Sequence, residues 1–174
     1  MFSTQRLFVP AALIFTGFLG VSAANAQDPS CPYTLASLQG SYSVLVNYGA
    51  NVALGLQAQT LDGKGNLTRT GIINQPTAGS TTGARTVAIV SSTGTYTVNC
   101  DGTGTIVKIV TRPDGTTAPA VDDFIITSAT KVVGRPPIAT TIVDTQRDPS
   151  VILPGGVFVT RVHTRLPDFT PFYN

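Results

Sequence analysis

The sequence contains no glutamate and no tryptophan, and charged residues make up only 11% of it. Solvent-facing helices rely on Glu, Lys, Gln and Ala, whereas Thr, Val, Ile, Ser and Gly dominate here. These absences argue against a helical protein and predict an all-β fold.

Strong charge of either sign is also missing. With Arg6 removed as part of an export signal, ten Lys and Arg face nine Asp, which leaves a net charge of +1. A nucleic-acid-binding protein usually carries a clustered basic patch, so we expect no nucleic-acid partner. Two Cys and one His, none closely spaced, are too few soft ligands for a zinc site. We therefore expect no metal and no cofactor.

The N-terminus has the three parts of a secretory signal peptide. Arg6 provides the positive start, Leu7 to Ala23 the apolar run, and Ala24-Asn25-Ala26 the cleavage site. A retained membrane anchor is the alternative, but Pro10 and two glycines interrupt the run. We predict cleavage after Ala26 and a secreted or periplasmic location. Residues 27–174 remain, 148 residues (174 minus 26), which suits one domain.

The two cysteines lie at Cys31 and Cys100. In an oxidising compartment they most simply form one disulfide, and two free buried thiols are the alternative. A disulfide would stabilise the fold by roughly 4 kcal/mol by closing a long loop.

The most informative stretch runs from Gly94 to Thr111. Tyr96, Val98 and Cys100 alternate with Thr and Asn, and Asp101-Gly102 is a strong hairpin signal. Similar alternating runs flank it, separated by turn residues such as Asp62-Gly63-Lys64-Gly65-Asn66. The expected strands are Ser41–Tyr48, Val52–Leu61, Leu67–Asn74, Arg85–Ser92, the two arms of the central hairpin, Val121–Thr127, Lys131–Gly134, Ile138–Asp144 and Val157–Leu166. Val121–Thr127 and Lys131–Gly134 are either two short strands or one bent strand.

Eight or nine short strands joined by tight turns predict an antiparallel up-and-down barrel of about eight strands. A sandwich is the alternative, but closure of a meander removes exposed strand edges. An outer-membrane barrel is less favoured because Phe and Tyr do not form girdles at two levels. We therefore predict no stable membrane span.

Several short motifs stand in a characteristic order: Cys31, Leu38-x-Gly40-x-Tyr42, Leu61-Asp-Gly-Lys-Gly-Asn-Leu67, Gly94-Thr-Tyr-Thr-Val-Asn99 and Thr103-Gly104-Thr105. This order resembles a group of small secreted bacterial proteins that are similar in outline to allene oxide cyclase-like and lipocalin-like barrels. The resemblance covers roughly residues 31–124 and implies a barrel fold with a disulfide. The group usually has Cys after the Asp of the hairpin, whereas here Cys100 precedes Asp101. We can match no cyclase catalytic residue onto the chain, so we carry over no activity.

His163 is the only histidine, and it shares one face of the last strand with Arg161 and Arg165. If this stripe points into the barrel, it can meet a carboxylate or phosphate ligand. Phe158, Val162 and Leu166 fall on the other face, which favours a stripe that faces solvent.

Three other features are candidates for a site. Tyr42 and Tyr96 lie on apolar strand faces, where they either line a ligand cavity or fill the core. Asp122 and Asp123 point to opposite faces and cannot form a paired-carboxylate site. We expect a solvated pair, and the alternative is that one of the two faces inward. No nucleophile motif accompanies His163.

The leading hypothesis is a secreted or periplasmic non-catalytic barrel that binds a small apolar ligand or a surface partner, with Tyr42, Tyr96, Arg161 and His163 as ligand-binding residues. The alternatives are a cofactor-free isomerase or cyclase of the allene oxide cyclase type, and a structural envelope protein with a filled core. The oligomeric state is left open.

Overall fold

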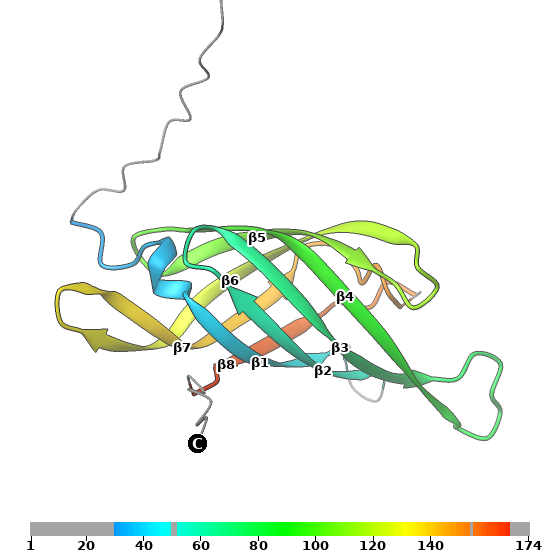
Figure 1. Cartoon of the computed structure of the whole chain (residues 1–174). Coiled ribbons are helices and arrows are strands. Elements are labelled where there is room, and N and C mark those ends of the chain that lie inside the picture. Colours follow the sequence, from blue (N-terminus) through cyan, green and yellow to red (C-terminus); the bar gives the residue numbers. More distant parts are fainter. Residues whose placement is uncertain (1–29, 50–51, 154, 168–174) are drawn as a thin grey trace, which may run out of the picture.

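The chain forms a closed antiparallel barrel in a computed structural model that describes residues 30–49, 52–153 and 155–167 (Figure 1). Each strand pairs with its neighbour in sequence, and β1 closes the barrel against β8. This confirms the predicted meander barrel. The predicted signal peptide lies outside the described residues. The strands are β1 (Gly40–Asn47), β2 (Leu54–Leu61), β3 (Asn66–Pro76), β4 (Arg85–Val98), β5 (Thr103–Thr111), β6 (Thr117–Val132), β7 (Arg135–Gln146) and β8 (Thr160–Arg165).

Some predicted boundaries were wrong. The fourth strand and the first arm of the central hairpin form one 14-residue strand, β4, because Ser92, Thr93 and Gly94 continue the ladder with β3. The runs after Val121 form the single strand β6, the second of the two alternatives, and its pairing with β7 is irregular between Ile126 and Val132. The final strand is shorter than predicted, and Phe158 precedes it at 60% exposure.

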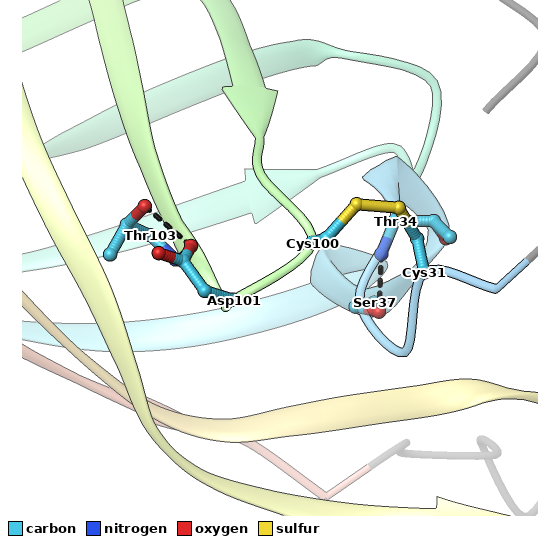
Figure 2. The surroundings of a disulfide bond; sticks show 6 residues. All are labelled: Cys31, Thr34, Ser37, Cys100, Asp101 and Thr103. Carbon is cyan, nitrogen blue, oxygen red and sulfur yellow. Dashed lines mark hydrogen bonds between the residues drawn. A yellow bond between two sulfur atoms is a disulfide. The ribbon is translucent and has the colours of Figure 1, made fainter. Parts of the chain in front are cut away.

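One end of the barrel is closed by the segment before β1. A 3-10 turn, η1 (Leu35–Leu38), buries Leu38 in an apolar cluster that includes Tyr42, Tyr96 and Phe124. The disulfide between Cys31 and Cys100 attaches this segment to the β4–β5 turn, as predicted (Figure 2).

A second apolar cluster fills the opposite part of the barrel. It contains Val44, Val46 and Tyr48 of the β1 region together with Ile73, Val90 and Val159. Between the two clusters the inward positions of β3, β4, β6 and β7 are polar. Arg69, for example, lies between Leu67 of the first cluster and Ile73 of the second. The interior therefore has three layers, of which the middle one carries charge.

Candidate functional site

The polar middle layer consists of inward side chains from seven of the strands. Its charged members are Arg69 on β3, Lys108 on β5, Asp122 on β6, Asp144 on β7 and Arg161 on β8; each is at most 5% exposed. Gln57, Gln59, Ser92, Gln146 and His163 complete it.

Two inward glycines make room for this layer. A Cβ at Gly71 would lie 2.7 Å from Cγ of Gln57, and one at Gly94 would lie 2.9 Å from Cβ of Lys108. Both separations are shorter than van der Waals contact, so the long polar side chains occupy space that a side chain at either position would take.

Asp144 is the hub of the network. Its Oδ1 accepts a 2.8 Å hydrogen bond from Nη1 of Arg161, and its Oδ2 lies 2.7 Å from Nε2 of His163 and 3.8 Å from Nη2 of Arg69. Burial opposes ionisation of this carboxyl, but the charge of Arg161 and the hydrogen bond from His163 hold its pKa well below the usual range. Asp144 is therefore an ionised carboxylate inside the barrel.

The neighbours of His163 define its tautomer. Ionised Asp144 can only accept, so Nε2 of the imidazole carries the proton and donates it. Nδ1 then accepts from the amide of Gln59 at 3.3 Å, and Oε1 of Gln59 accepts from Nε of Arg69 at 2.6 Å. Burial lowers the pKa of His163, so the ring is neutral at pH 7.

Asp122 contacts Lys108 and shares Arg161 with Asp144. Its Oδ2 accepts from Nζ of Lys108 and lies 3.1 Å from Nη1 of Arg161. Burial, together with the charges of Arg161 and Arg69, lowers the pKa of Lys108 to about 7. Below that pH the layer contains three cations and two carboxylates, an excess of one positive charge.

A cavity of about 20 Å³ adjoins this layer. Gln57, Arg69, Ser92, Lys108 and Arg161 line it together with Tyr48, and Val90, Val110 and Ile152 contribute apolar surface. The volume suffices for one or two water-sized groups. Arg69 lines this cavity, and its Nη2 is buried without a hydrogen-bond partner, although it lies 3.8 Å from Oδ2 of Asp144 in an ion pair. Oδ1 of Asp122 is likewise buried without a hydrogen-bond partner.

Two members of the basic stripe on β8 face inward, contrary to our expectation, while the third, Arg165, is half-buried and donates to the carbonyl of Gln39. Arg161 and His163 are 5% and 0% exposed, whereas Val162 between them is 43% exposed. The expectation of a solvated pair was also wrong for Asp122, which is fully buried, while Asp123 on the opposite face forms an exposed ion pair with Arg147. Burial is possible because each inward charge has a partner of opposite sign from another strand.

The two tyrosines lie away from the cavity, in the apolar cluster beside η1. The hydroxyl of Tyr42 donates to the carbonyl of Ala139 at 2.9 Å. That of Tyr96 accepts from the backbone N–H of Gly63 at 2.9 Å and donates to the carbonyl of Leu35 at 3.3 Å. Both rings fill the core, and their predicted ligand contacts stay predictions.

Sequence reasoning missed seven of the ten members of the layer, namely Gln57, Gln59, Arg69, Ser92, Lys108, Asp144 and Gln146. A usable signal was present, because Lys108 stands alone between Val107 and Ile109. Where a single charge interrupts aliphatic residues in a strand, either the charge or its apolar neighbours must face water.

Among the described residues, no group of three or more His, Cys, Asp or Glu side chains is placed to hold a metal ion. Within the same residues, no helix is long and apolar enough to cross a membrane. Comparison of the chain with models of protein families, with curated proteins and with solved structures finds no match. The resemblance to allene oxide cyclase-like barrels therefore stays a prediction.

Proposed function

We propose that this protein is an extracytoplasmic, non-catalytic barrel that binds a small monovalent anion, either a halide or the carboxylate of an organic acid, in its charged middle layer. The observation that carries the proposal is Nη2 of Arg69, a buried donor without a hydrogen-bond partner on a residue that lines the cavity. The surrounding layer has an excess of one positive charge when Lys108 is protonated. A buried, uncompensated charge is costly, and one bound anion would balance it. The Cys31–Cys100 disulfide supports export to an oxidising compartment.

The interior volume argues against the two other ligand classes. Pockets for organic ligands usually measure roughly 300–1,000 Å³. The interior cavity measures about 20 Å³, too little for a bulky apolar ligand or for a flexible cyclase substrate. A groove of about 560 Å³ does lie at the barrel end, lined by residues that include Pro76, Ile152 and Leu153. Ile152 lines both spaces, so the tail of a carboxylic acid bound in the cavity would pass Ile152 to reach the groove.

Affinity for the anion should decrease as the pH rises. Lys108 faces Arg69, Asp122, Asp144 and Arg161, and burial brings its pKa to about 7. Above this pH Lys108 loses its proton, and the excess positive charge disappears. A chloride dissociation constant measured at pH 6 should therefore be smaller than one measured at pH 9.

Thermal unfolding tests the proposal. At constant ionic strength, chloride, formate or octanoate replaces gluconate, a carboxylate whose hydroxylated chain does not suit the groove lined by Pro76, Ile152 and Leu153. An anion at 100 times its dissociation constant stabilises the native state by about 2.7 kcal/mol. For a chain of this length that corresponds to an increase in Tm of roughly 5–10 °C. Stabilisation by chloride indicates a free halide, and stabilisation by octanoate alone indicates an organic acid.

Two variants provide the comparison. Arg69→Gln removes the unused donor and should abolish the anion-specific shift, whereas Arg85→Gln removes an exposed arginine that bonds Asn74 and should retain it. Line broadening of the chloride-35 NMR signal by the wild-type protein provides a second readout that does not depend on either variant. Equal Tm in all four salts, together with no broadening, would contradict the proposal.

A further inference from the structure

The outer wall of the barrel carries a continuous row of exposed aliphatic side chains. Seven strands contribute one residue each, and every member is the direct register partner of the next: Ile125, Val143, Val162, Leu45, Leu56, Ile72 and Ile89. Their exposures range from 36% for Val143 to 71% for Ile89. We refer to this row as the outer aliphatic ladder.

On two of its strands the ladder follows from polar or charged residues that point into the barrel. On β8, Arg161 and His163 face inward, which leaves Val162 outside; on β2, Gln57 and Gln59 do the same for Leu54 and Leu56. Isolated aliphatic side chains are normal on a protein surface, but contiguous patches of several hundred Å² usually mark an interaction site.

Charge is absent from the part of the wall around Leu45 and Leu56. The outward residues of β8, β1, β2 and β3 are aliphatic, Ala, Ser, Thr, Asn or the terminal Pro76, and none is ionisable. The exposed Arg85 of β4 lies at the edge of this area, where it bonds Asn74, the register partner of Leu54. The wall of β6 differs, because Asp123 there forms an exposed ion pair with Arg147. The apolar surface therefore has one uncharged side and one charged side.

We propose that a second copy of the chain covers the uncharged side of the ladder, centred on Leu45, Leu56 and Ile72. Two identical uncharged faces do not repel each other, and a two-fold axis would place each ladder against the other copy's ladder. The exposed aliphatic area of this side, with Leu54 and Ile89, is on the order of 500 Å². The flanking Ser and Thr residues would extend it toward the roughly 800 Å² per partner of a stable interface.

A surrounding bilayer fits the wall less well. It would enclose the whole barrel, including the Asp123–Arg147 pair, whose side chains are 46% and 55% exposed. Charges on a lipid-facing barrel wall are strongly unfavourable near the middle of the bilayer. The dimer rests on the outer wall alone and does not depend on anion binding in the interior.

Sedimentation velocity across a range of protein concentrations tests the dimer. The wild-type protein should sediment as a dimer, and Leu56→Lys should increase the dimer dissociation constant at least tenfold. Val107→Lys is the matched control, because Val107 is a mid-strand outward residue of β5 with 52% exposure, close to the 59% of Leu56, and lies outside the ladder. This variant should dimerise like the wild type.

Three outcomes would overturn the proposal: a wild-type protein that stays monomeric at every concentration, equal effects of Leu56→Lys and Val107→Lys, or monomers that float with phosphatidylcholine vesicles. Circular dichroism confirms that each variant is folded. The double substitution of Leu45 and Ile72 to Ser provides a second route if Leu56→Lys does not fold.

Discussion

Asp122 and Asp123 are adjacent in sequence, but only Asp122 belongs to the interior layer, so the same substitution at each position measures what the layer contributes. Asp122→Asn removes the carboxylate that Lys108 and Arg161 share. Asp123→Asn removes a carboxylate that contacts Arg147 in an ion pair about half exposed to water.

The expected costs differ several-fold. In the Asp122→Asn protein three interior cations face one carboxylate, and breaking a buried pair in this way usually costs about 3–5 kcal/mol. Because the pKa of Lys108 is about 7, loss of its proton offsets part of that cost above neutral pH. We therefore expect about 3 kcal/mol at pH 8 and a larger cost at pH 6. Asp123→Asn should cost no more than about 1 kcal/mol.

Urea unfolding of both variants, followed by far-UV circular dichroism, gives the two free energies. A loss of 3 kcal/mol corresponds to a decrease in Tm of roughly 6–12 °C for a chain of this length. Equal losses at the two positions, or a larger loss for Asp123→Asn, would refute the inward placement of the charges. If the interior binds an anion, Asp122→Asn should also increase chloride affinity, because it adds one unit of positive charge.

Three further measurements address other parts of the molecule. Urea titrations should give an unfolding free energy that falls as the pH is lowered from 9.5 to 5. The folded-state pKa values of Lys108 and His163 lie below their unfolded values, so the unfolded chain binds protons first. A flat or opposite trend would contradict the burial of these two groups. Reduction of the disulfide, which spans 69 residues, should lower the unfolding free energy by about 4 kcal/mol, measured by urea unfolding with and without reductant. A decrease below about 1 kcal/mol would show that η1 docks without the disulfide. Tyr96→Phe should lower the unfolding free energy by about 1–2 kcal/mol, because the hydroxyl of Tyr96 bonds two backbone groups. The chloride-induced shift in Tm should stay the same. A smaller chloride shift would instead place Tyr96 in the ligand site.

The strand pattern and turn residues predicted the meander barrel, because those signals are local. Asp62-Gly63-Lys64-Gly65-Asn66 forms the β2–β3 turn, where the carboxylate of Asp62 accepts from the backbone N–H groups of Lys64 and Asn66. The alternation of β1 correctly placed Tyr42, Val44 and Val46 inside.

The same rule failed where the inward face is polar. On β8 it favoured Val162 and Phe158 as core residues, but the core takes Arg161 and His163. On β4 the aliphatic residues Val87 and Ile89 are 60% and 71% exposed. Period-two alternation separates two faces of a strand without stating which face is inside. Hydrophobicity decides which face points inward only when the charged residues of the strand have no ionic partners inside the barrel.

The ionic partners come from strands distant in sequence. Asp144 on β7 receives Arg161 and His163 from β8 and approaches Arg69 from β3. No short-range pattern connects these positions, because their proximity results from closure of the barrel. The candidate site therefore emerges only when all eight strands are in register.

A crystal structure of the protein grown in sodium bromide tests the central claim most directly, since bromide scatters anomalously and replaces chloride in anion sites. We predict Arg69, Lys108 and Arg161 inside the barrel and an anomalous peak in the cavity within hydrogen-bonding distance of Nη2 of Arg69. A cavity that holds only water while bromide binds elsewhere would contradict halide binding, and a barrel with these three side chains in solvent would contradict the whole account.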